Sequence, residues 1–193
     1  EWLTREPDNA VAQHQLAAVE DMRSPPPPRA SDAYVETVFD SYAPQFDAKL
    51  KGLDYCAPQL VARALAARAG PARATLDIVD LGCGTGLCGV EIRPLAQRLV
   101  GCDLSTGMLL QARRRALYDE LYKVELLHFL RHEPGRFDAL VSADTLCYFG
   151  ALDDVAMAAA NALRPGGCFV FTVEALEPRA GQHRLQPSGR YAH

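Results

Sequence analysis

The sequence lacks the features that mark several large classes of protein. Its six cysteines form no CxxC pair and accompany no closely spaced histidines, so the spacing predicts neither a zinc site nor a redox motif, and we expect no bound metal. The formal net charge is only −4, which disfavours nucleic acid or an anionic membrane as the main partner. The sequence has no signal peptide and no long apolar span, so we expect a cytoplasmic protein with buried thiols.

The most informative segment that is present runs from Leu76 to Gly86 and reads LDIVDLGCGTG. An apolar strand carries Asp80 near its end, and an apolar-periodic helix is predicted from Leu87 to Ala96. The turn between them carries three glycines, Gly82, Gly84 and Gly86. Glycine lets the backbone approach a ligand closely, and a helix start leaves unpaired N–H groups facing it. The segment predicts a nucleotide-type pocket, with tight packing of the turn as the alternative.

The glycine spacing is GxGxG, whereas the dinucleotide fingerprint is GxGxxG, which points away from NAD. DLGCGTG resembles motif I of the class I methyltransferases that use S-adenosyl-L-methionine. The resemblance implies that cofactor, and it implies contact by Asp80 and by the turn residues Gly82, Cys83, Gly84 and Gly86.

A second acidic strand end lies about 20 residues further on, in RLVGCDLSTGML. The run Arg98 to Cys102 predicts a strand closed by Asp103, whose carboxylate can accept both ribose hydroxyls. Ser105 predicts the N-cap of a helix running to about Ala116. The family resemblance implies that Asp103 holds the ribose, that the adjacent Leu104 contacts the cofactor and that Met108 lies near the adenine. Core packing is the alternative for Met108.

A third, shorter strand is predicted from Lys123 to Leu127. Glu125 stands where the family usually has an aspartate that accepts from the adenine amine, so the resemblance assigns Glu125 and Leu126 to the cofactor site. A solvent-facing carboxylate at a strand end is the alternative for Glu125.

The last two predicted strands complete the family pattern. Phe137 to Ala143 is apolar and delivers Asp144, resembling motif IV of the family. NALRPGGCFVFTVE predicts a helix end, a turn at 165–167 and a strand from Cys168 to Val173. These segments predict a Rossmann-like, doubly wound, mostly parallel sheet with helices on both faces and ligands beyond the carboxyl ends of the strands.

The first third of the chain predicts helices. Residues 1–23 are expected to form one helix beginning near Pro7, with an apolar side of Leu16, Ala17 and Val19, and residues 24–30 a proline-rich linker. The helix resembles the end of a tetratricopeptide-type repeat, as in a bacterial methyltransferase group, and a lone packing helix explains it equally well. Such helices could recruit a protein partner or mediate self-association.

Residues 31–70 have helical spacing with an aromatic stripe. FDSYAPQFDAKL and LDYCAPQLV resemble the N-terminal segment of the repeat-linked methyltransferases and of the Williams–Beuren-region methyltransferase group, in which these helices cover the cofactor. The resemblance implies a helical lid in which Tyr34 and Tyr42 contact the sulfonium, whose charge is attracted by aromatic faces. Core packing is the alternative for the stripe. Residues 71–193 are then the cofactor-binding domain.

We expect in-line methyl transfer to a small-molecule acceptor. The sequence has no Pro-Cys dipeptide, which argues against cytosine C5 methylation. It also has no Asn- or Asp-Pro-Pro-aromatic motif after the fourth strand, where the enzymes that methylate amino groups of nucleic acids resemble one another. It also lacks the paired glutamates of protein arginine methyltransferases there. No catalytic residue is assigned; side chains able to act as a base are Asp144, Tyr148, His183 and His193. A non-catalytic cofactor-binding or scaffold protein is the alternative, and an NAD-dependent oxidoreductase is a third.

After the fifth strand only ALEPRAGQHRLQPSGRYAH remains. This segment is too short for the helix and final antiparallel strand pair of the family. We therefore expect that strand pair to be missing, either because residues are absent from the chain or because its core has five strands.

Overall fold

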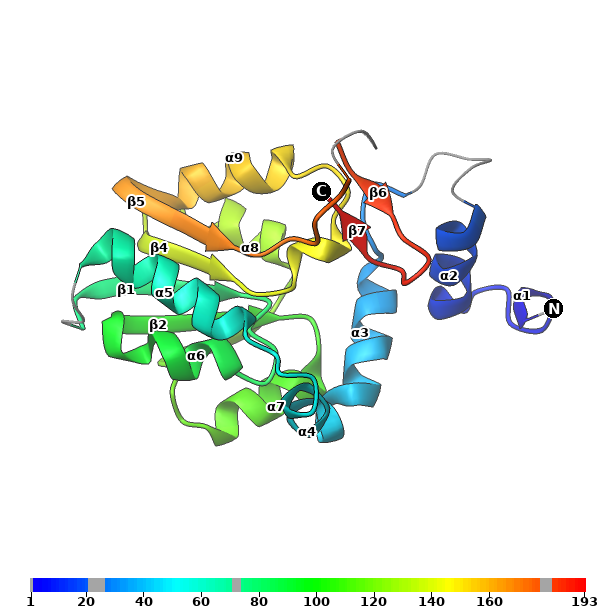
Figure 1. The fold of residues 1–193 in the computed structure, drawn as a ribbon, viewed down its shortest axis with the longest axis horizontal. Helices are drawn as coiled ribbons and strands as arrows, with labels where there is room; N and C mark the ends of the chain where they lie inside the picture. The colour runs from blue at the N-terminus through cyan, green and yellow to red at the C-terminus, as the bar shows by residue number, and fades with distance from the viewer. Residues whose placement is uncertain (1, 21–26, 71–73, 178–181) are drawn as a thin grey trace.

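The computed structural model describes residues 2–20, 27–70, 74–177 and 182–193, and its centre is a five-stranded parallel sheet in the order β3-β2-β1-β4-β5 (Figure 1). The strands are β1 Leu76–Leu81, β2 Ala96–Asp103, β3 Glu120–Lys123, β4 Phe137–Ser142 and β5 Leu163–Phe171. The strand order reverses between β1 and β4, and open sheets of this kind bind ligands at such a reversal. The predicted α/β fold is confirmed.

Helices cover both faces of the sheet, as predicted. On one face α5 (Ala57–Ala69) contributes Val61 and Leu65, and α6 (Leu87–Ile92) contributes Ile92, to a core cluster with Ile78 of β1. On the other face α8 (Leu126–Arg131) and α9 (Asp153–Ala162) pack over β4, and α7 (Thr106–Arg114) joins β2 to β3. β1 and β4 are covered on both faces, and most of their residues are buried and apolar.

Two predicted element boundaries are wrong, for local reasons. The helix predicted to reach Ala96 ends at Ile92 and continues only as a 3-10 turn, η2 (Arg93–Leu95), because Pro94 cannot donate the next helical hydrogen bond. Ala96 instead begins β2. The third strand ends at Lys123, and Glu125 caps α8 by accepting the backbone N–H of His128 at 2.8 Å.

β5 begins earlier than predicted. It starts at Leu163 opposite Phe137, and regular pairing resumes at Cys168 opposite Ala139. The predicted turn at 165–167 is thus an irregularity within the strand.

The helix predicted to begin near Pro7 begins at Ala10, and a separate short helix precedes it. The described part forms α1 (Trp2–Arg5) and α2 (Ala10–Glu20), because the side chain of Asn9 caps the second helix by accepting from Val11 and Ala12 at 3.1 and 3.0 Å. Two of the side chains predicted to be on its apolar side, Leu16 and Val19, are exposed. The buried side chains of α2 are instead Ala12, His14 and Ala18. Residues 21–26, which include the start of the predicted linker, and residues 71–73 lie outside the described residues.

The next helices reach the carboxyl ends of the strands. α3 (Asp32–Tyr42), η1 (Ala43–Gln45) and α4 (Phe46–Lys51) lie across the strand ends, with α1 and α2 on the side away from the sheet (Figure 1). We call α3, η1 and α4 together the cover. α5, which was predicted within the lid, packs on the sheet face instead.

The expectation that the C-terminal strand pair is missing needs correction. β6 (Arg184–Leu185) and β7 (Tyr191–Ala192) form an antiparallel pair, but this pair is a separate small sheet rather than an extension of β5. Its Leu185 and Tyr191 pack against Ala18 of α2. Among the described helices, none has the length and apolar character that crossing a bilayer requires.

Candidate functional site

The glycine turn after β1 depends on two close approaches. Gly82 has a φ of +70°, and a Cβ there would lie 2.2 Å from the hydroxyl oxygen of Thr145. Its backbone N–H and that of Cys83 both donate to the carbonyl of Cys102, at 2.8 and 3.0 Å. The turn is therefore held against the carboxyl end of β2.

Asp103, at the end of β2, binds this turn directly. Its Oδ2 accepts the backbone N–H of Gly84 at 2.9 Å, and its Oδ1 accepts the backbone N–H of Ser105 at 2.8 Å. Burial raises the pKa of Asp103, although these amides and that of Leu104 act in the opposite direction. Asp103 thus couples the glycine turn to the start of α7, where Ser105 is the predicted N-cap and accepts from Met108 at 3.0 Å.

Asp80 is the most deeply buried carboxylate of the strand ends, with 1% of its surface exposed. Burial raises its pKa to about 7. A hydrogen bond of 2.6 Å, which the Tyr118 hydroxyl donates to Oδ2, acts in the opposite direction. The other oxygen, Oδ1, is buried without a hydrogen-bond partner. A buried acceptor in this state favours a positively charged or N–H-bearing ligand.

Glu125 shows the same pattern. Its Oε2 caps α8, whereas its Oε1 is buried without a partner. The carboxylate that was predicted at a strand end therefore lies at a helix start, with one oxygen still free to accept.

Asp144 follows β4 in the left-handed conformation, with a φ of +54°. Its backbone N–H donates to the Thr172 hydroxyl, which in turn donates to Asp144 Oδ1, both at 2.8 Å. Tyr55, between α4 and α5, interacts with Asp144. Burial raises the pKa of Tyr55 most, and the charge of Asp144 and a hydrogen bond with it raise this pKa further. Tyr55 was not foreseen from the sequence.

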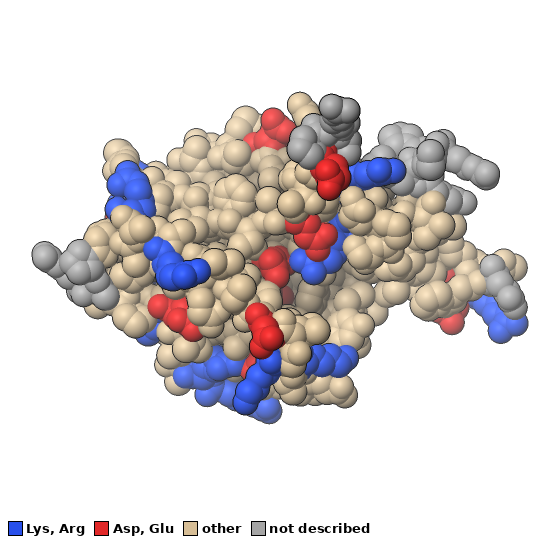
Figure 2. Space-filling view, in the orientation of Figure 1, with Lys and Arg blue, Asp and Glu red and all other residues tan. Residues whose placement is uncertain are grey.

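These strand ends form the floor of a cavity of about 440 Å³, and Figure 2 shows a hollow with acidic and basic side chains at its rim. The volume falls within the range of small-molecule sites. Eleven of the predicted cofactor residues line it: Tyr42, Asp80, Gly82, Cys83, Gly84, Asp103, Leu104, Met108, Glu125, Leu126 and Asp144.

Two predicted residues do not line the cavity. Tyr34 is buried with its ring 4.0 Å from that of His14, so it packs between α2 and α3 rather than over the strand ends. Gly86 is the N-cap of α6 and faces the ring of Tyr118 instead. We leave both out of the proposed ligand contacts.

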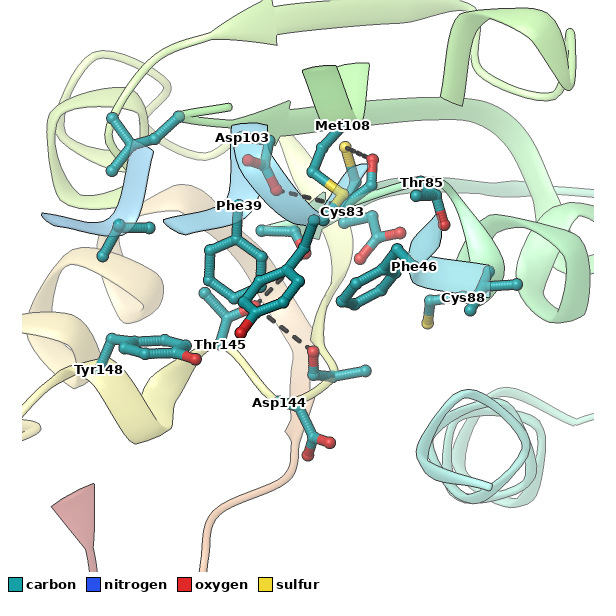
Figure 3. A pocket seen from close by; sticks show the side chains of 18 of the residues that line it. Phe39, Phe46, Cys83, Thr85, Cys88, Asp103, Met108, Asp144, Thr145 and Tyr148 are labelled. Atoms are coloured by element: carbon teal, nitrogen blue, oxygen red, sulfur yellow. Dashed lines mark hydrogen bonds between the residues drawn. The ribbon is translucent and has the colours of Figure 1, made fainter. Parts of the chain in front are cut away.

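The cover adds aromatic side chains that sequence reasoning treated only as a stripe. Phe39 packs edge-on against Phe46 and Tyr148, with ring centroids 6.1 and 5.5 Å apart, and all three line the cavity (Figure 3). Lys49 places its Nζ 4.5 Å from the ring centroid of Tyr42. The cavity thus has an acidic floor and an aromatic cover.

Two aspartates fasten the cover to the floor. Asp40 accepts from the Ser105 hydroxyl at 2.5 Å and from the Gly107 N–H at 2.8 Å. Asp47 accepts from the Thr85 hydroxyl at 2.6 Å and pairs with Arg115. No local motif marks either aspartate, because their partners are 38 to 68 residues away in the sequence.

The possible bases separate into two groups. Asp144 and Tyr148 line the cavity, whereas His183 and His193 do not. The two histidine rings lie 6.3 Å apart beside the C-terminal strand pair, and burial together with His183 lowers the pKa of His193. Within the described residues, no cluster of three or more His, Cys, Asp or Glu side chains could hold a metal ion.

Comparison with known proteins agrees with this geometry. Residues 79–169 match a family model described as a methyltransferase domain. Human Methyltransferase-like protein 27 is 35% identical over 170 residues, which are 79% of this chain and 66% of that protein. The chain contains a class I S-adenosylmethionine-dependent methyltransferase domain.

Other relatives match smaller or similar shares of this chain. The bifunctional biotin biosynthesis protein BioHC of Saccharophagus degradans is 36% identical over 101 residues, which are 49% of this chain and 18% of that protein. A solved structure described as the DhpI-SAM-HEP complex has a TM-score of 0.54 and 25% identity, and covers 80% of this chain and 76% of its own. The chain spans 66% or less of the curated relatives it matches here.

The cavity fits the cofactor of this family, S-adenosylmethionine. The cofactor carries an ammonium group, a sulfonium and an adenine amine, and the floor offers two unpartnered buried acceptors, Asp80 Oδ1 and Glu125 Oε1. Because these acceptors gain hydrogen bonds or an opposite charge from such a ligand, the methyltransferase domain is suited to hold it.

Proposed function

We propose that the protein transfers a methyl group from S-adenosylmethionine to a small-molecule acceptor enclosed between the floor and the cover. The observation that carries this proposal is the single cavity shared by the strand-end carboxylates and the aromatic cover. In our assignment Asp103 holds the ribose, Glu125 the adenine amine and Asp80 the ammonium end. Gly82, Cys83 and Gly84 provide the backbone surface, with Leu104, Met108 and Leu126 as apolar contacts.

The bound cofactor would supply an activated methyl group on a sulfonium, so the protein's own task is alignment and exclusion of water. Phe39, Phe46 and Tyr148 suit that task, because together they form an apolar roof over the cavity. If the acceptor must lose a proton, we propose Asp144 as the group that receives it, with Tyr55 and Thr172 orienting its carboxylate.

A small acceptor is supported by charge, cavity size and relatives. The chain is acidic, and the cavity has the size of a small-molecule site. Relatives 28% and 31% identical are named Ubiquinone biosynthesis O-methyltransferase and Malonyl-[acyl-carrier protein] O-methyltransferase. Another relative, 31% identical over 84 residues, is named 18S rRNA (guanine-N(7))-methyltransferase, so RNA is the competing acceptor class for the test.

For the whole chain we propose the division drawn from the sequence: an N-terminal helical part at 1–23, a linker at 24–30, a lid at 31–70 and the cofactor-binding domain at 71–193. Its lid would consist of the cover alone, since α5 packs on the sheet. Kinship with repeat-linked methyltransferases stays a prediction for the α1–α2 pair. We propose Methyltransferase-like protein 27 as the relevant subgroup because its match covers 79% of the chain.

The test has two stages. Calorimetric titration with S-adenosylmethionine and S-adenosylhomocysteine should show binding, whereas preference for NADH would overturn the assignment. Incubation with methyl-labelled cofactor and separate pools of small metabolites, total RNA and protein should then label the small-molecule pool. Tight cofactor binding with no label in any pool would favour a non-catalytic scaffold.

A further inference from the structure

Tyr118, in the connection between α7 and β3, occupies a slot that three glycines leave open. Cβ atoms placed on Gly86, Gly89 and Gly101 would lie 3.0, 2.5 and 3.0 Å from atoms of the Tyr118 side chain. Those glycines belong to the turn after β1, to α6 and to β2. A side chain at any of the three would displace the ring, so the slot and the tyrosine fit each other.

The backbone around Tyr118 is fixed on both sides. Arg93 donates to the carbonyl of Leu117 at 3.2 Å and to Asp119 Oδ2 at 2.7 Å, and Asp119 Oδ2 also accepts the backbone N–H of Leu99 at 2.7 Å. These contacts attach the connection to η2 and β2. The hydroxyl is therefore directed at one place, Oδ2 of Asp80, at 2.6 Å.

Asp80 has no basic partner in the described part of the chain, where Tyr118 is its hydrogen-bond donor. The titratable groups that face it come from the connection before α5, the glycine turn, α6, β2 and the connection before β3. They are Tyr55, Cys83, Cys88, Cys102, Asp103 and Tyr118. All of them are neutral or negative, so none stabilises the ionised carboxylate as a cation would.

We propose that Tyr118 is a positioning residue for the cofactor: its hydroxyl holds Oδ2 of Asp80 and favours the ionised carboxylate, whose Oδ1 is free for the positive end of the ligand. This inference rests on the proposed function. It assigns a binding role to a residue outside the cavity lining and to the three-glycine slot that admits it.

The consequence is a cofactor affinity that depends on pH near neutrality. Burial raises the pKa of Asp80 to about 7, and the Tyr118 hydroxyl opposes that rise. Only the ionised form attracts a cation, so affinity should increase as pH rises through this value and fall again once the ammonium of the ligand is deprotonated. Removing the hydroxyl should move the midpoint to higher pH.

The experiment compares Tyr118→Phe with Tyr122→Phe, a matched control whose hydroxyl donates to Glu120 on the surface strand β3. The Asp80 carboxyl carbon is titrated by NMR in the cofactor-free protein, and S-adenosylhomocysteine and S-adenosylmethionine binding is measured by calorimetry from pH 5.5 to 9. In Tyr118→Phe the Asp80 midpoint should rise by about one pH unit. Binding should then be about fivefold weaker than in the wild type at pH 7 and nearly equal to that of the wild type at pH 9. Tyr122→Phe should match the wild type.

Three outcomes overturn the proposal: an unchanged Asp80 midpoint in Tyr118→Phe, a loss of affinity that is equal at every pH, or an equal shift in Tyr122→Phe. Gly89→Ala provides a second variant, since its Cβ displaces the Tyr118 hydroxyl and should raise the midpoint in the same direction. A wild type that binds neither cofactor form overturns the proposed function instead, while the NMR titration still decides whether Tyr118 sets the ionisation of Asp80.

Discussion

The floor and the cover of the cavity are built in different ways. Each floor carboxylate lies near the carboxyl end of a strand, where the sequence pattern marks it. Its partners are both local, as Ser105 is to Asp103, and distant, as Tyr118 is to Asp80. The cover is attached by Asp40 and Asp47 and by packed rings, and its contacts join residues 38 to 68 positions apart. A floor placed by the strand ends suits a constant cofactor, whereas a separately attached cover can change with the acceptor.

The largest effect should come from closing the tightest approach of the floor. Gly82→Ala places a Cβ 2.2 Å from Thr145 and requires alanine at a φ of +70°. The overpacking and the backbone strain together should lower stability by about 2 to 4 kcal/mol, or about 4 to 16 °C in melting temperature. Calorimetry or circular dichroism measures the change.

Gly135→Ala is the control for that variant. Gly135 has a similar φ of +62°, but a Cβ there meets nothing within 4 Å. Its cost should be strain alone, about 1 kcal/mol. Equal losses in the two variants would mean that the contact with Thr145 is unimportant.

Asp103→Ala tests the floor as a binding surface. It removes the acceptor of the Gly84 and Ser105 amides and the proposed ribose contact. Cofactor affinity should fall by roughly 1.5 to 3 kcal/mol, about tenfold to 150-fold, because charge-assisted hydrogen bonds are lost. Asp154→Ala, at an exposed position on α9, is the control in the same titration. Unchanged affinity in Asp103→Ala would refute the ribose assignment.

The contrast between floor and cover also explains what the sequence could predict. Strand ends, glycine turns and caps are local, so the sheet and the positions of Asp80, Asp103 and Asp144 followed from the pattern. Glu125 was predicted within the third strand, but it is the N-cap of α8. The strand is short, and the sequence prediction did not consider that the Glu125 side chain could accept the backbone N–H three residues later.

Long-range contacts could not be predicted in that way. Nothing near Tyr34 in the sequence indicates that its ring meets His14, and nothing near Tyr118 indicates a slot made by three glycines from three elements. Both contacts depend on how separate elements pack. Composition and periodicity do not specify such packing.

Asp40→Ala should loosen the cover while leaving the floor intact. Burial raises the pKa of Asp40, but hydrogen bonds from Ser105 and Gly107 outweigh it and lower the pKa below its ordinary value. The contribution is therefore present at neutral pH and lost as pH falls through the lowered pKa. We expect about 1 to 2 kcal/mol less protection from hydrogen exchange in residues 32–51 at pH 7, with no change in β1 and β4.

Asp32→Ala is the control for that variant, because its ion pair with Arg29 is on the surface and should contribute little. Faster exchange in the sheet of Asp40→Ala, equal to that in the cover, would mean that the two regions open together. The distinction between floor and cover would then fail.

The smallest effect concerns the two tyrosines of α3 that the sequence treated alike. Tyr42 lines the cavity with Lys49 over its ring, whereas Tyr34 is buried against His14. Tyr42→Ala should weaken binding of S-adenosylmethionine about two- to fivefold, since an exposed ring attracts a cation by about 0.5 to 1 kcal/mol. Tyr42→Phe, which keeps the ring, and Tyr34→Phe, which changes a residue outside the cavity, should both bind as the wild type does. Titration of the three variants with S-adenosylmethionine measures these affinities. If Tyr34→Phe lost as much affinity as Tyr42→Ala, the cover would act on the cofactor through its packing and not through the ring that faces the cavity.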